Sequence, residues 1–119
     1  LDNFTIIIEK GYESLPYIEL GNEITISFND HTIPDEYALY DYVLSVDGSP
    51  KYTNKEVREI PLTIENGTGS LILGVHFAAL LSSHSDDYKS GASIRGFKLI
   101  CRWGEDECEY GFIVRSDAH

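Results

Sequence analysis

Apolar and polar residues alternate along much of this chain with a period of two, which is typical of β-strands that bury one face. In the segment 24–29, two isoleucines and a phenylalanine alternate with threonine, serine and asparagine. In the same way Tyr40, Tyr42 and Leu44 alternate with polar residues that include Asp41. The pattern predicts about seven strands, near residues 4–9, 24–29, 40–47, 60–65, 70–81, 94–103 and 107–115.

Seven short strands with turns at short intervals, and no alternation of strands with helices, predict one all-β domain over residues 1–119. The expected architecture is a two-sheet antiparallel β-sandwich of the immunoglobulin-like or jelly-roll kind. Two segments have helix signals instead. Residues 34–36 resemble a first helical turn, and residues 77–83 contain the helix-favouring run Ala-Ala-Leu-Leu.

Local signals also predict where some strands lie in their sheets. The segment 70–81 is apolar on both faces, so we expect it to form a central strand. Pro61 has no N–H to donate to a ladder, which indicates that the strand at 60–65 lies at an edge or begins near the proline. Asn66-Gly67 is the hairpin turn expected between these two strands.

The last two predicted strands bring the two cysteines of the chain together. If Gly104 and Glu105 form a two-residue turn, Cys101 lies directly across from Cys108, on the apolar face of the hairpin. We expect a disulfide between them in an oxidising compartment, although the cysteines then occupy a hydrogen-bonded pair, an uncomfortable position for a cross-strand disulfide. Buried free thiols and a reactive pair are the alternatives. The predicted disulfide is the main reason to expect an extracellular or cell-surface location.

Composition excludes several classes of partner. The chain has 20 acidic and nine basic residues and a net charge of −11, which repels nucleic acid and anionic lipid. No apolar run approaches the roughly 18 residues that span a bilayer, so we expect no membrane insertion. The chain begins at Leu1 and contains no methionine, which suggests a processed protein or a module of a longer one.

Motifs for catalysis are weak, and we expect no enzyme activity. Residues 91–95 fail the nucleophile-elbow pattern at its last position, and residues 67–70 lack the lysine of a phosphate-binding loop. The histidines at 31, 76 and 84 do not have metal-ligand spacing. We expect no cofactor. Calcium is possible only through acidic residues of separate loops, because no EF-hand sequence occurs.

Aromatic residues supply the remaining functional signal, with eight Tyr, five Phe and one Trp. A tyrosine or tryptophan offers a flat apolar face with a polar handle, suited to stacking on sugars or anchoring a protein. The chain is therefore expected to be a non-catalytic module that binds carbohydrate or a cell surface. The alternative is a structural or protein-interaction domain, such as an immunoglobulin-like spacer, a virion or tail decoration, or an acidic inhibitor. The ligand-binding candidates are Tyr12, Tyr17, Tyr37, Tyr52, Tyr88 and Trp103.

Overall fold

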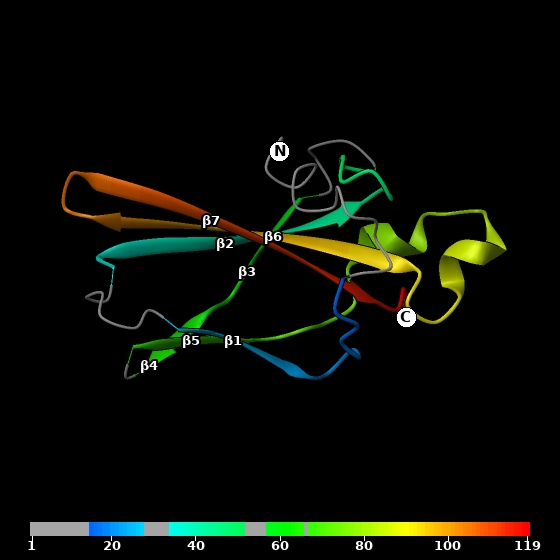
Figure 1. The fold of residues 1–119 in the computed structure, drawn as a ribbon, viewed down its shortest axis with the longest axis horizontal. Coiled ribbons are helices and arrows are strands. Elements are labelled where there is room, and N and C mark those ends of the chain that lie inside the picture. Colours follow the sequence, from blue (N-terminus) through cyan, green and yellow to red (C-terminus); the bar gives the residue numbers. More distant parts are fainter. Residues whose placement is uncertain (1–14, 28–33, 52–56, 66) are drawn as a thin grey trace.

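The computed structural model describes residues 15–27, 34–51, 57–65 and 67–119, and these residues form two antiparallel sheets packed face to face (Figure 1). The three-stranded sheet has the order β1-β5-β4, and the four-stranded sheet has the order β3-β2-β6-β7. The strands are β1 (Glu23–Ser27), β2 (Glu36–Leu44), β3 (Arg58–Ile60), β4 (Thr63–Glu65), β5 (Thr68–Ile72), β6 (Ser93–Trp103) and β7 (Asp106–Ser116). This confirms the predicted all-β, two-sheet antiparallel sandwich.

The segment predicted as one strand over residues 60–65 is divided between the two sheets. Its first part belongs to β3, at one edge of the four-stranded sheet, and its second part is β4, at one edge of the three-stranded sheet. Pro61 and Leu62 form the two-residue crossing between them. The predicted edge position is confirmed, because a residue without an N–H fits where the chain leaves a ladder.

The strand predicted over residues 70–81 is central, as expected, but much shorter. β5 ends at Ile72, and a short 3-10 helix, η4 (Phe77–Leu80), follows. The His76 side chain caps this helix, since its Nδ1 accepts a hydrogen bond from the Ala78 N–H at 3.1 Å. The helical interpretation of this run is therefore nearer to the structure than the strand pattern.

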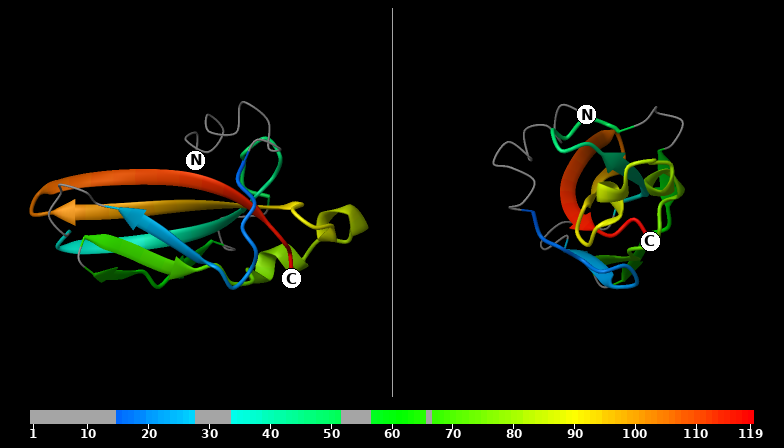
Figure 2. Two further views of the ribbon diagram at one scale, coloured as in Figure 1. Left: turned by 60° about the horizontal axis from the view of Figure 1, so that its bottom comes forward. Right: turned by 90° about the vertical axis from the view of Figure 1, so that its right-hand side faces the viewer.

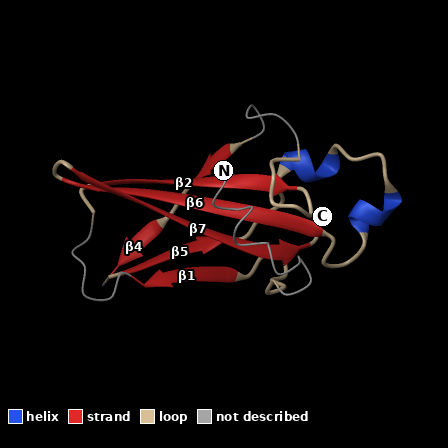
Figure 3. Ribbon diagram, turned by 45° about the horizontal axis from the view of Figure 1, so that its top comes forward, coloured by secondary structure: helices blue, strands red, loops and turns tan. Residues whose placement is uncertain are grey.

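Two further features of the structure were not predicted. β2 begins at Glu36, so the helical turn expected at residues 34–36 is wrong. The polar stretch after η4, for which the sequence pattern predicts no strand, contains a second 3-10 helix, η5 (Ser85–Tyr88). Both short helices lie beyond one end of the sheets (Figures 2 and 3). The strand expected at residues 4–9 lies outside the described residues.

The face of β2 that points into the sandwich is the opposite of the one suggested by its tyrosines. Leu39, Asp41 and Val43 are buried, and Leu39 packs in the main core with Phe97 and residues of the three-stranded sheet. Tyr42 lies on the outer side, where it packs with a second apolar cluster, Leu15, Leu44, Ile94 and Ile113. The pattern was misleading because a charged residue, Asp41, occupies a core position.

The hairpin β6–β7 has the predicted register. Trp103 pairs with Asp106 around the turn at residues 104–105, and Gly104 has a positive φ of 58°, as tight hairpin turns require. Cys101 pairs with Cys108. Arg102 pairs with Glu107, and their charged groups approach to 3.5 Å between Nη2 and Oε1.

Candidate ligand pocket between the two sheets

A buried ion pair links β2 and β6 on the inner face of the four-stranded sheet. Arg95 Nε donates a hydrogen bond to Asp41 Oδ1 at 2.8 Å, and Arg95 Nη2 donates a second one to Asp41 Oδ2. The two side chains are 2% and 4% exposed. Charges are rarely buried unless they are paired, and the two-pronged geometry of a guanidinium on a carboxylate is the favoured arrangement. Arg95 is thereby fixed in orientation.

His76 extends this network and is held as a neutral side chain. Its Nδ1 accepts from the backbone N–H of Ala78, so that nitrogen carries no proton. Its Nε2 lies 3.1 Å from the backbone oxygen of Asp41 and donates its proton there. Burial lowers the pKa of His76 below its ordinary value, in agreement with the neutral form. Because both nitrogens are occupied, His76 is poorly placed for proton transfer or metal binding.

Arg95 Nη1 is buried and makes no hydrogen bond within the described part of the protein. A buried donor without a partner costs about 1–3 kcal/mol, and more when the group is charged. Most buried polar groups in folded proteins are paired with protein atoms or with ordered water.

Arg95 and Asp41 line a pocket between the sheets, beside the Pro61–Leu62 crossing. Its volume is about 440 Å³, and both sheets contribute to its wall. Ile60, Pro61 and Leu71 supply apolar surface. The polar residues that line it are Glu23, Asp41, Arg58, Thr63, Ser70 and Arg95. Two arginines and two acids balance among these residues, so the described wall is polar but carries no net formal charge.

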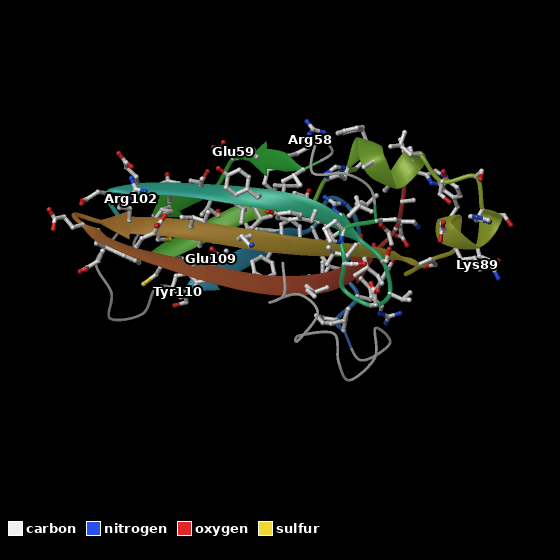
Figure 4. All side chains as sticks on the ribbon, turned by 90° about the horizontal axis from the view of Figure 1, so that it is seen from above. Arg58, Glu59, Lys89, Arg102, Glu109 and Tyr110 are labelled. Carbon is white, nitrogen blue, oxygen red and sulfur yellow. The ribbon has the colours of Figure 1, made fainter. Side chains whose placement is uncertain are left out.

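Arg58 connects the pocket with an exposed aromatic ring. Its guanidinium lies 5.8 Å from the centroid of the Phe77 ring, within the range of a cation–π contact. Phe77 in turn stacks on His76, with ring centroids 5.2 Å apart. Figure 4 shows Arg58 at the margin of the molecule formed by β3, opposite the margin at which Tyr110 lies. An aromatic side chain therefore lies beside the pocket without being part of its wall.

The aromatic residues singled out from the sequence lie elsewhere and do not form one platform. Tyr17 donates from its hydroxyl to Asp117 Oδ2 at 2.6 Å, and it pairs with Arg115 near the end of β7. The Tyr88 hydroxyl lies 3.0 Å from the backbone oxygen of Leu80 and 2.6 Å from that of Ser82. Both tyrosines therefore hold chain segments in place.

Two other candidates lie near the turn of the β6–β7 hairpin, at the far end of the four-stranded sheet. Tyr37 is exposed and pairs across the sheet with Cys101, while Trp103 is half-buried and packs against the main core. Tyr110, which the sequence did not single out, is also exposed in this region. Tyr12 and Tyr52 lie outside the described residues. Neither Tyr37 nor Trp103 lines the pocket between the sheets.

The cysteines are free thiols in this structure, which differs from the disulfide that we expected. Cys101 is fully buried in the main core, and Cys108 is exposed. With a two-residue turn, the pair falls at a hydrogen-bonded position of the ladder, where side chains are farther apart than at the alternate positions. The register itself is as predicted.

The described part of the chain holds neither a cluster of metal-binding side chains nor a membrane-spanning helix. No group of three or more His, Cys, Asp or Glu side chains within it is arranged to hold a metal ion. No helix within it has the length and apolar character needed to cross a membrane. Calcium binding therefore stays a prediction that rests on the sequence.

Sequence reasoning missed Asp41 and Arg95, the residues at the centre of the site. The available signal was the position of Arg95 in the alternating pattern, because it lies on the same face of β6 as the core residues Phe97, Leu99 and Cys101. A charged residue in step with core residues indicates a buried ion pair.

Comparisons give no further guidance: no family model, no curated protein and no solved structure matches this chain.

Proposed function

We propose that this chain is a non-catalytic binding module and that the pocket between its sheets holds a neutral, polyhydroxylated ligand of the carbohydrate type. The observation that carries this proposal is the pocket of about 440 Å³ between the sheets, whose wall combines apolar side chains with the fixed Arg95–Asp41 pair. Small-molecule sites combine apolar walls with a few oriented polar groups, and this pocket has both.

The chemistry of the wall favours hydroxyl groups over ions. A sugar hydroxyl both donates and accepts, so it can serve acidic and basic side chains of the wall, such as Glu23 and Arg58, in turn. The balance of two arginines against two acids gives no preference for an anionic or a cationic ligand. The apolar surface of Ile60, Pro61 and Leu71 suits the C–H face of a sugar ring.

Binding is a better use of this site than catalysis. Both oxygens of the Asp41 carboxylate accept hydrogen bonds from Arg95, so the carboxylate is engaged in the ion pair. Both nitrogens of His76 are occupied by backbone groups. These two side chains therefore act as fixed acceptors and supports.

Isothermal titration calorimetry against a panel of neutral mono- and oligosaccharides tests the proposal, and Gly74 offers a selective variant. Gly74 lines the pocket, and a Cβ added there meets no atom within 4 Å. Gly74→Leu should therefore add bulk at the wall of the pocket without disturbing the fold. We expect the wild type to bind a member of the panel and the variant to bind it at least about tenfold more weakly, equivalent to about 1.4 kcal/mol.

Tyr37→Ala is the matched control, because Tyr37 is exposed at the hairpin end and does not line the pocket. It should bind with unchanged affinity. Loss of binding in Tyr37→Ala with retention in Gly74→Leu would move the site to the aromatic residues of the hairpin end. Absence of binding across the whole panel would contradict the carbohydrate proposal.

The alternative proposal is a protein-interaction domain, and one observation favours it. Val75, Phe77, Leu80 and Leu81 are all exposed within a span of seven residues around η4. Neighbouring exposed apolar side chains are typical of interaction surfaces. If this proposal is right, Leu81→Asp should abolish a complex or oligomer that native mass spectrometry detects for the wild type.

A further inference from the structure

The two thiols at the end of the β6–β7 hairpin have a geometry that the ligand pocket does not use. Cys101 and Cys108 pair directly across the two strands, so their Cβ atoms leave the same face of the hairpin. Directly opposed Cα atoms at a hydrogen-bonded pair are about 5.5 Å apart, within the span that a disulfide bridges. The span therefore permits a bond, and the hydrogen-bonded position makes that bond less comfortable, and so more easily reduced, than one at a non-hydrogen-bonded pair.

Their surroundings differ sharply. Cys101 is fully buried, and this burial raises the pKa of its thiol, which disfavours the reactive thiolate. Cys108 is exposed, and every residue of β7 from Asp106 to Gly111 is exposed with it. A reagent in solution therefore meets Cys108 first.

We propose that Cys101 and Cys108 form an exchangeable dithiol site, in which Cys108 is the entry thiol for a small aliphatic disulfide and Cys101 is the resolving thiol. In the first step Cys108 gives its proton to water, and its thiolate attacks one sulfur of the reagent. A mixed disulfide forms on Cys108, the reagent's own disulfide breaks, and one thiol leaves after taking up a proton.

In the second step Cys101 gives its proton to water, and its thiolate attacks the Cys108 sulfur. The Cys101–Cys108 bond forms, the mixed disulfide breaks, and the second small thiol leaves protonated. The protein dithiol has lost two electrons and the reagent has gained them. The site is therefore a reversible two-electron couple between this hairpin and a small disulfide.

The structure favours an exchangeable bond over a permanent crosslink. One partner lies on the open surface, where a small thiol can attack the bond again, and exposed disulfides are the labile ones. The bond would also close only the short stretch of chain from Cys101 to Cys108 at the end of the hairpin, so it restrains the unfolded chain less than a bond across a longer loop. The flanking Glu107 and Glu109 are paired with Arg102 and Lys98, so these side chains give no strong preference for a cationic or an anionic reagent.

Cystamine, a small aliphatic disulfide, is the probe for the full reduced chain. Samples taken over time are quenched with acid, and the intact mass and peptide maps of each are measured. We expect a transient cysteamine adduct on Cys108, followed by a product that is lighter than the reduced chain by two hydrogen atoms. Reduction by excess dithiothreitol should restore the starting mass.

Two single variants separate the roles of the thiols. Cys101→Ala should stop at the adduct on Cys108, and alanine keeps the core position apolar. Cys108→Ser should react at least about tenfold more slowly than the wild type, because its remaining thiol is buried.

Three outcomes would overturn the proposal. They are a wild-type chain that stops at the adduct, one that links to a second chain instead, and a Cys108→Ser variant that reacts as fast as the wild type. None of them bears on the carbohydrate proposal, because neither cysteine lines the pocket between the sheets.

Discussion

Removal of one member of the Arg95–Asp41 pair is the most direct perturbation of this fold. Arg95→Met keeps the length of the side chain and removes its charge, which takes away the cation bonded to the buried Asp41 carboxylate. His76 cannot replace the arginine, because its protonated nitrogen already donates to the backbone oxygen of Asp41. Arg58 pairs with Asp41 across β2 and β3, so it is the cation that remains on this side of the sheet. The carboxylate is then a buried charge without its bonded partner.

The expected cost follows from the burial of the pair. Both side chains are at most 4% exposed, and breaking such a pair typically costs about 3–5 kcal/mol. A domain of this size is stable by about 5–15 kcal/mol in total, so the variant loses a large fraction of its stability. In contrast, replacing both charges by apolar groups is often neutral or stabilising. The free energy of unfolding of the double variant Arg95→Met with Asp41→Val should therefore lie within about 1 kcal/mol of the wild-type value.

Urea unfolding at pH 7, followed by far-UV circular dichroism, measures all four proteins of this cycle. With a slope of about 1–3 kcal/mol per M, the midpoint of each single variant should fall by at least about 1 M. The double variant should recover nearly all of that loss. The buried-pair reasoning would be refuted if each single variant lost less than about 1 kcal/mol of its free energy of unfolding. It would also be refuted if the loss in the double variant equalled the sum of the two single losses.

Three further predictions concern other parts of the fold. Burial lowers the pKa of His76, so the unfolded chain binds a proton at this histidine more readily than the folded chain does. The free energy of unfolding should therefore fall as the pH drops below about 6.5. In urea unfolding, His76→Gln should show a weaker dependence of this free energy on pH. Gly91 has a φ of 74°, and an added Cβ lies 3.3 Å from Arg115 Nη1, so Gly91→Ala should cost about 1–3 kcal/mol in the same assay. Leu99 is fully buried, and Leu99→Ala should cost about 2–5 kcal/mol, measured as a lower thermal midpoint and a lower urea midpoint.

The fold class was predictable because its signals are local. The period-two pattern and the turn residues around Gly104 are properties of neighbouring residues, and they were enough for the sandwich class and the last hairpin. The first and last residues of η4 were harder to predict, since the strand pattern and the helix propensity of the same residues disagree. The His76 cap decides between them, and that contact is invisible as a pattern.

The site was not predictable for a different reason. The pocket exists because the chain changes sheet at Pro61, and a proline indicates an edge without indicating which sheet follows. The partnership of Asp41 with Arg95 joins residues 54 positions apart in the chain. A period-two pattern treats a charged residue as outward-facing, so it assigned Asp41 to the wrong face of β2.

The two-residue crossing between β3 and β4 has a mechanical consequence for ligand entry. Three peptide steps from Ile60 to Thr63 span at most about 11 Å, and packed sheets lie about 10 Å apart. The chain at this crossing is therefore almost fully extended, and it holds the two sheets together at this point. The sheets therefore cannot separate much further at Pro61, and the pocket beside the crossing keeps its width there.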